Sequence, residues 1–153
     1  MPLNIRDLAI SSPDVEALGP IDPKFSADGG NQVPQLVISG VPEEAVELAL
    51  ILTDPDAPLP HGFTHWTVFN LPAQDGLVNA EVLSKATTGL NGMGEASYSG
   101  PQPPPGHGLH HYYFWVYALD TVVLGTPNRE QFLTDYAENI VEQNRLVATF
   151  VNE

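Results

Sequence analysis

The chain has 153 residues, of which 42% are hydrophobic, so it is long enough for one domain with its own core, and we expect a single domain over residues 1–153. Five lysine and arginine residues oppose nineteen aspartate and glutamate residues, and the resulting net charge of −14 argues against nucleic acid and anionic membrane surfaces as partners. The absence of cysteine excludes disulfides and thiol chemistry.

The N-terminal segment and the hydropathy of the chain predict its location. Residues 1–7 lack a long apolar run and include Asp7, so they do not resemble a signal peptide. No run approaches the roughly 18 apolar residues of a membrane span. We therefore expect a soluble, cytoplasmic protein that is not integral to a membrane.

Short segments rich in β-branched and aromatic residues recur along the chain, separated by glycine and proline. Such segments are typical of β-strands. They cover residues 3–11, 35–39, 45–53, 64–71 and 110–119. The fifteen prolines and thirteen glycines fall mostly between them and predict long, rigid loops. The sequence therefore predicts a mainly β fold.

Two acidic residues follow the third predicted strand, in the sequence Asp54-Pro-Asp-Ala-Pro. Asp54 continues the more apolar face of this strand, where a carboxylate needs a partner. A loop of about ten residues, longer than most hairpin loops, then leads to the next strand at Thr64-His65-Trp66. A hairpin of this kind brings His65 close to Asp54.

A loop rich in glycine and proline, residues 98–109, leads directly into the fifth predicted strand. Because side chains alternate along a strand, His110 and Tyr112 share one face and His111 lies on the other. A histidine and a tyrosine therefore lie side by side where the strand begins. The three prolines at 103–105 favour a rigid wall of this site over a ligand for a polyproline-binding module.

The C-terminal part of the chain predicts a helix that packs on the sheet. Thr126 and Pro127 are suited to the cap and the first turn of such a helix. Apolar residues then recur on one side at helical spacing. They are Phe132, Tyr136, Ile140 and Val147, with Leu133, Ala137 and Val141 adjacent.

Five histidines and several aspartates raise the alternative of a metal site, because imidazole and carboxylate groups are good ligands for zinc and non-haem iron. The alternation along the strand weakens it, since only His65, His110 and one aspartate could converge. Hydrolytic chemistry lacks support, because no Gly-x-Ser-x-Gly motif or other evident nucleophile is present. We expect a binding protein that is not an enzyme and needs no metal or other cofactor.

Together, these motifs resemble those of the phosphatidylethanolamine-binding protein family, which includes Raf kinase inhibitor protein and compact bacterial members. The matching segments are Asp-Pro-Asp-Ala-Pro at 54–58, His-Trp at 65–66, and Tyr-x-Gly-Pro-x-Pro-Pro-x-Gly-x-x-x-His at 98–110, followed by Tyr112. The resemblance covers nearly the whole chain and implies two packed antiparallel sheets with peripheral helices. It also implies a small anion-binding pocket built from Asp54, His65, His110 and Tyr112, with Gly100 and Pro101 in the loop beside them.

The resemblance implies phosphate-like anions or phospholipid head groups as ligands, and some relatives inhibit kinases or proteases. No lysine or arginine lies in the matching segments, so positive charge must come mainly from His65 and His110, and binding should weaken as the pH rises above the range of histidine. We expect Tyr112 to donate a hydrogen bond to the ligand and Asp54 to orient a histidine. The alternatives are a protein–protein regulator with a vestigial pocket and, less favoured, a metal-dependent enzyme.

Overall fold

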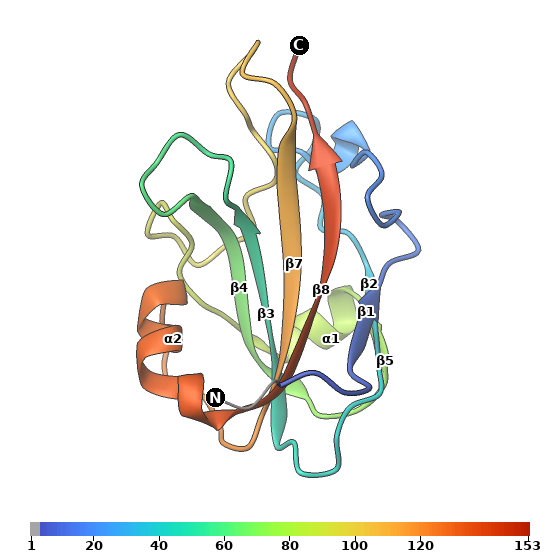
Figure 1. The fold of residues 1–153 in the computed structure, drawn as a ribbon, viewed down its shortest axis with the longest axis vertical. Helices are drawn as coiled ribbons and strands as arrows, with labels where there is room; N and C mark the ends of the chain where they lie inside the picture. The colour runs from blue at the N-terminus through green and yellow to red at the C-terminus, as the bar shows by residue number, and fades with distance from the viewer. Residues whose placement is uncertain (1–3) are drawn as a thin grey trace.

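The computed structural model describes residues 4–153 and contains two antiparallel β-sheets that pack against each other (Figure 1). The smaller sheet has the strand order β1-β2-β5, and the larger has the order β6-β4-β3-β7-β8. The smaller sheet consists of β1 (Ala9–Ser11), β2 (Leu36–Ser39) and β5 (Gly76–Val78). The larger consists of β6 (Thr87–Thr88), β4 (Phe63–Pro72), β3 (Glu47–Asp54), β7 (His110–Leu119) and β8 (Ile140–Phe150). The predicted mainly β fold of two antiparallel sheets is confirmed.

Short helices lie at the periphery of the two sheets. They are α1 (Ala80–Ser84), α2 (Arg129–Tyr136) and the 3-10 helices η1 (Pro23–Phe25) and η2 (Ala137–Asn139). In residues 4–153, no helix has the length and apolar character needed to cross a membrane.

The main core lies between the two sheets. Along β3 and β7 the side chains alternate, so that every second residue points inward. The inward, buried residues include Leu48, Leu50 and Leu52 of β3, Tyr112, Phe114 and Val116 of β7, and Leu36 and Ile38 of β2. Burial of one such side chain stabilises the fold by about 1.5–3 kcal/mol. The same alternation brings Asp54 and His110 to the inner side, where their strands end and begin, and both are buried.

A second, smaller core lies on the outer face of the larger sheet, where α2 covers it (Figure 1). Phe132 of α2 is fully buried there, with its ring centroid 5.2 Å from that of Phe69 and 5.5 Å from that of Tyr117. The expected packing of this helix on the sheet therefore holds for α2, which contacts the sheet through Phe132.

The predicted C-terminal helix is wrong beyond Tyr136. After η2 the chain forms β8, which pairs along its whole length with β7. From residue 140 onward the sequence is rich in valine and other β-branched residues, and the buried residues, at 142, 146 and 148, are separated by even numbers of residues, as on one face of a strand. The helix also begins later than predicted, because Asn128 is the N-cap and forms a capping box with Gln131.

The first predicted strand is shorter than expected, since only Ala9–Ser11 pairs with β2, and part of the predicted range lies outside the described residues. The backbone before β1 is held instead by Glu142 of β8, whose buried carboxylate accepts hydrogen bonds from the N–H groups of Arg6 and Leu8. These two backbone N–H groups are therefore not available to pair with a neighbouring strand.

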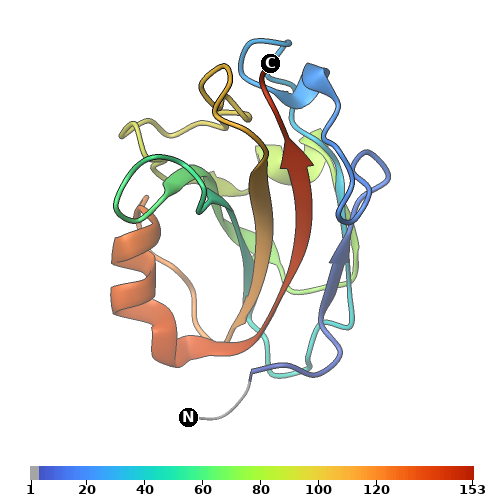
Figure 2. The ribbon, with the colours of Figure 1, turned by 45° about the horizontal axis from the view of Figure 1, so that its top comes forward.

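Three segments distant in sequence meet at one end of the larger sheet (Figures 1 and 2): the β3–β4 loop, the segment leading into β7, and the end of β8. The last two are tied together, because the Gly106 N–H donates to the Asn152 carbonyl at 3.0 Å and the Asn152 side chain donates to the Pro103 carbonyl at 3.1 Å.

Candidate functional site

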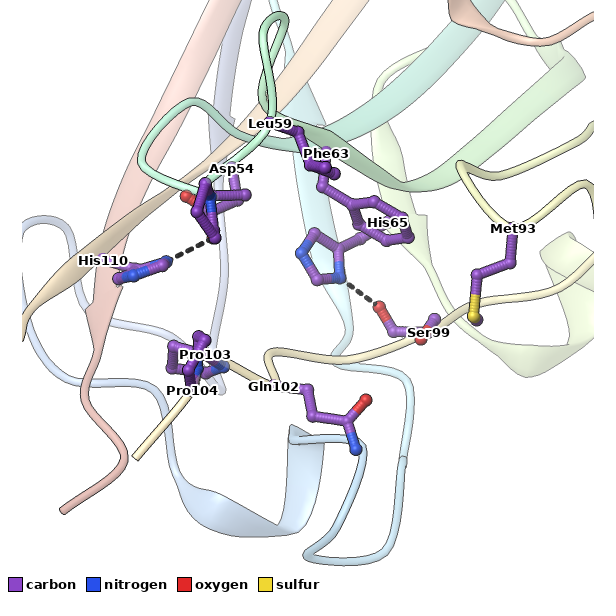
Figure 3. Close-up of a pocket in the computed structure, with 12 residues that line it drawn as sticks. Asp54, Leu59, Phe63, His65, Met93, Ser99, Gln102, Pro103, Pro104 and His110 are labelled. Carbon is purple, nitrogen blue, oxygen red and sulfur yellow. Dashed lines mark hydrogen bonds and ion pairs between the residues drawn. The ribbon is translucent and has the colours of Figure 1, made fainter. Parts of the chain in front are cut away.

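A cavity of about 330 Å³ opens at this end of the molecule, between the β3–β4 loop, the start of β4 and the segment before β7 (Figure 3). Its lining residues are Asp54, Ala57, Pro58, Leu59, Phe63, His65, Met93, Ser99, Gln102, Pro103, Pro104 and His110. Most of them are apolar, and none is lysine or arginine. Three of the six predicted site residues therefore line one cavity, namely Asp54, His65 and His110.

Asp54 and His110 form a buried pair on the wall of this cavity. The Nδ1 of His110 lies 2.7 Å from the Oδ2 of Asp54, and the two side chains are 2% and 3% exposed, respectively. The other carboxylate oxygen of Asp54 accepts a hydrogen bond from the backbone N–H of Asp56 at 2.8 Å. The carboxylate thus has the partner that its buried position requires, and it fixes the orientation of the His110 ring.

His65, near the start of β4, is buried and keeps one ring nitrogen for the cavity. Its Nδ1 donates a hydrogen bond to the carbonyl oxygen of Ser99 at 2.7 Å. Figure 3 shows the other ring nitrogen turned away from Ser99. Burial lowers the pKa of His65, although the Ser99 carbonyl and the charge of Asp54 oppose this shift. His65 therefore favours its neutral form, which argues against the prediction that it supplies positive charge.

Tyr112 lies behind the two histidines rather than at the surface of the cavity. Its ring centroid is 5.4 Å from that of His65 and 6.5 Å from that of His110. Within residues 4–153, its buried hydroxyl has no hydrogen-bond partner. Burial, followed by the negative charge of Asp54, raises the pKa of this hydroxyl. The group therefore stays protonated, and Asp54 is close enough to attract its hydrogen.

Gly100 and Pro101 do not line the cavity. The N–H of Gly100 donates to the side-chain oxygen of Asn31 at 2.7 Å, and the carbonyl of Pro101 accepts from the N–H of Ala27 at 3.0 Å. A Cβ atom at position 100 would lie 2.0 Å from the carbonyl oxygen of Phe25, so only glycine fits there. These two residues fasten the loop to the segment after η1, and they position the cavity wall without forming it.

Several lining residues were not predicted from the sequence. Gln102, Pro103 and Pro104 belong to the proline-rich loop, where the consecutive prolines did indicate a wall but not which residues face the cavity. Met93 comes from a glycine-containing loop in which no sequence pattern indicated a site residue. His107 was also missed, although its Nδ1 lies 2.6 Å from the Nε2 of His110.

The neighbouring acid and histidine lie on the other face of the sheet, as the alternation predicts. The Nδ1 of His111 bonds to the Oδ2 of Asp56 at 2.7 Å, and both side chains are more than 40% exposed. Partial burial would raise the pKa of Asp56, but the hydrogen bonds from His111 outweigh it, and the pKa is lowered. Among the described residues, no three His, Asp or Glu side chains form a group that could hold a metal ion.

Comparison with known proteins identifies the family of this chain. The family model of phosphatidylethanolamine-binding protein matches residues 11–151. The chain belongs to the phosphatidylethanolamine-binding protein family. A UPF0098 protein of Pyrococcus abyssi is 37% identical over 139 residues, which cover 85% of this chain and 78% of the relative.

Two solved structures of this family are similar over nearly the whole chain. The crystal structure of Escherichia coli YbcL, described as a new member of the mammalian family, has a TM-score of 0.88 and 26% identity, covering 97% of this chain and all of YbcL. A Chlamydia trachomatis homologue of phosphatidylethanolamine-binding protein has a TM-score of 0.86 and 32% identity, covering 98% of this chain and 99% of that protein. These matches confirm the expected fold and family, whereas the names themselves assign no ligand to this chain.

Proposed function

We propose that this member of the phosphatidylethanolamine-binding protein family binds, without turnover, a small ligand with a phosphate-like head group. The observation that carries this proposal is the buried Asp54–His110 pair on the wall of an open cavity. A carboxylate behind an imidazole stabilises the protonated ring, which can then donate a hydrogen bond to an anion. The Tyr112 hydroxyl is buried behind the two histidines and does not line the cavity, so its donation of a hydrogen bond to the ligand stays a prediction.

The walls of the cavity support a ligand that also has an apolar part. Phe63, Leu59 and Met93 contribute apolar surface, and Pro103 and Pro104 form a rigid side. The volume of about 330 Å³ is at the lower end of the range for small-molecule sites, about 300–1,000 Å³. A phospholipid head group or a phosphorylated side chain meets both conditions, because each joins a phosphate to carbon groups.

The electrostatics of the cavity support weak and pH-dependent binding. With Asp54 ionised and His110 protonated, the pair is neutral overall, and His65 favours its neutral form. No lysine or arginine lines the cavity to add charge. Affinity should therefore depend on the proton of His110 and fall as the pH rises.

The absence of turnover is part of the proposal. A histidine–aspartate pair acts as a general base only when a nucleophile lies within hydrogen-bond distance of the free ring nitrogen. Here the recorded partner of the His110 Nε2 atom is another histidine, His107. A cytoplasmic location likewise stays a prediction from the sequence.

A second candidate function is regulation of a kinase or protease by direct contact. Leu59 and Met93 at the cavity are 53% and 55% exposed, and apolar residues in such positions favour a protein partner. A His110 variant distinguishes the two functions. If it loses anion binding but binds the protein partner as the native chain does, the pocket is vestigial. For the less favoured metal-dependent enzyme, elemental analysis of untagged protein should find no stoichiometric metal.

The proposed function is tested by calorimetric titration with O-phosphoethanolamine and inorganic phosphate at pH 6 and pH 8. The variant His110→Asn keeps a donor for Asp54 but loses the ring nitrogen that faces the cavity side. The matched control is His111→Asn, because His111 makes the equivalent bond to Asp56 on the opposite face. We expect saturable binding at pH 6 that weakens at pH 8, is lost in His110→Asn and persists in His111→Asn. Equal binding by both variants, or no binding by the native chain, would refute the proposal.

A further inference from the structure

His107 lies against the one ring nitrogen of His110 that a ligand would need. Its Nδ1 is 2.6 Å from the Nε2 of His110, and the ring centroids are 4.8 Å apart in an edge-on arrangement. Because the Nδ1 of His110 already bonds to Asp54, the Nε2 is the only nitrogen left on that ring. In this structure His107 therefore takes the position at which an anion would accept a hydrogen bond from His110.

The proton count of this contact limits the states in which it exists. Two ring nitrogens at 2.6 Å share a single hydrogen, carried by one ring and accepted by the other. If both nitrogens carry hydrogens, the two N–H groups point at each other and the two positive rings repel. The contact is therefore stable when at most one of the two rings is positively charged, and it breaks when both rings are.

The loop around His107 has open space beside it. Gly106 and Gly108 flank His107, with φ angles of 74° and 94°, and an added Cβ at either would meet no atom within 4 Å. His107 itself is exposed, whereas His110 is buried. The loop is held by two backbone bonds, from the Gly106 N–H to Asn152 and from the His107 N–H to Pro104, and by the Asn152 side chain, which donates to the Pro103 carbonyl.

We propose that His107 is a proton-dependent latch that competes with the ligand for the Nε2 of His110; this inference rests on the proposed anion-binding function. When both rings are neutral, the Nδ1–H of His107 donates to the Nε2 of His110, because the hydrogen of His110 is on the Nδ1 that faces Asp54. Once His110 is protonated, His107 is the acceptor and an anion can replace it, and protonation of His107 as well removes that acceptor and releases the loop. Acid therefore acts twice, because it charges His110 and opens the latch.

Other titratable groups face this pair from the neighbouring elements. Asp54 of β3 lies behind His110, and His65 of β4 faces it across the cavity. Asp56, in the β3–β4 loop, is close enough for the charge of His110 to lower its pKa further. Both aspartates place negative charge near His110, whereas a protonated His65 would place positive charge across the cavity from it. The C-terminal segment contributes Asn152, which does not titrate.

The test compares the phosphate affinity of the native chain with that of His107→Ala, again by calorimetry at pH 6 and pH 8. The control is His61→Ala, since His61 is an exposed loop histidine with no recorded contact to His110. If the latch is closed about 80–90% of the time at pH 8, its removal should raise the apparent affinity about five- to tenfold. The gain should be smaller at pH 6, and His61→Ala should match the native chain at both values. An unchanged or weaker affinity of His107→Ala at pH 8 would overturn the latch.

Failure of the latch is distinguishable from failure of the proposed function. Binding that is lost in His110→Asn but unchanged in His107→Ala overturns the latch alone. Tighter binding by His107→Ala than by the native chain, with binding lost in His110→Asn, supports both. If neither the native chain nor any variant binds phosphate, the anion-binding function fails. Nitrogen-15 spectra of the imidazole rings then test whether His107 and His110 are hydrogen-bonded. A His110 titration that is the same in the native chain and in His107→Ala would show that the rings are not coupled.

Discussion

At the scale of single residues, Asp54 and Asp56 form the same kind of bond in different surroundings. Each carboxylate lies 2.7 Å from the Nδ1 of a histidine. The Asp54–His110 pair is almost completely buried, whereas the side chains of Asp56 and His111 are 41% and 45% exposed. Water screens the exposed pair and not the buried one, so the two pairs should differ in their contribution to stability.

We expect Asp54→Asn to lower the free energy of unfolding by about 1–3 kcal/mol, because buried His110 loses its charged partner. Asp56→Asn, the matched exposed change, should alter it by less than about 1 kcal/mol. Phosphate affinity at pH 6 should also fall in Asp54→Asn only, since the amide offers no negative charge to a protonated ring. Urea unfolding at pH 7 and calorimetry measure these effects. Equal destabilisation by the two variants would contradict the role of burial.

The sequence could predict part of this site, because strand alternation and hairpin geometry are local properties. They placed Asp54, His65 and His110 at neighbouring strand ends, and all three line the cavity. They could not predict that His65 favours the neutral form, because this depends on burial by residues from other segments. The contact of His107 with His110 was equally inaccessible, since the path of the loop depends on its bonds to the C-terminal segment.

At the scale of elements, the C-terminal part of the chain shows how one apolar pattern can fit two structures. Phe132, Tyr136 and Ile140 are four residues apart and therefore share one side of a helix. The helix nevertheless ends at Tyr136, and β8 begins at Ile140. A strand there is stabilised by pairing with β7, a contact between segments about 30 residues apart that periodicity does not reveal. The strands predicted at 35–39, 45–53, 64–71 and 110–119 agree closely with β2, β3, β4 and β7, whereas the first was predicted too long.

The beginning of α2 gives a test at the same scale. Asn128 accepts a hydrogen bond from the N–H of Gln131 at 2.9 Å, and the Gln131 side chain accepts one from the N–H of Asn128 at 3.0 Å. Asn128→Ala should therefore lower the free energy of unfolding by about 0.5–2 kcal/mol. Thr126→Ala, at the position that the sequence suggested as the cap, should have little effect. Urea unfolding of both variants measures the difference, and a larger loss in Thr126→Ala would mean that the helix begins earlier.

At the scale of the whole molecule, the net charge of −14 opposes both compaction and the approach of an anion. The few cations do little to offset this charge. Arg6 pairs with Glu44 and Glu142 at one site, and the guanidinium of Arg145 lies over the rings of Tyr113 and Trp115 on the outer face of the sheet. None of these residues lines the cavity, so the charge on the cavity side is set by histidine and aspartate.

Self-repulsion of this size should make the fold more stable in salt. The Debye length falls from about 30 Å at 0.01 M salt to about 10 Å at 0.1 M, so repulsion across the molecule is largely screened at the higher concentration. Screening also weakens exposed pairs such as Arg6–Glu44, but each of these contributes less than about 1 kcal/mol. We expect the Tm to rise by about 2–4 °C between 0.01 M and 0.5 M sodium chloride, equivalent to about 1 kcal/mol for a chain of this size. Tetramethylammonium chloride at equal ionic strength should give the same rise, whereas a rise with sodium alone would indicate cation binding instead of screening.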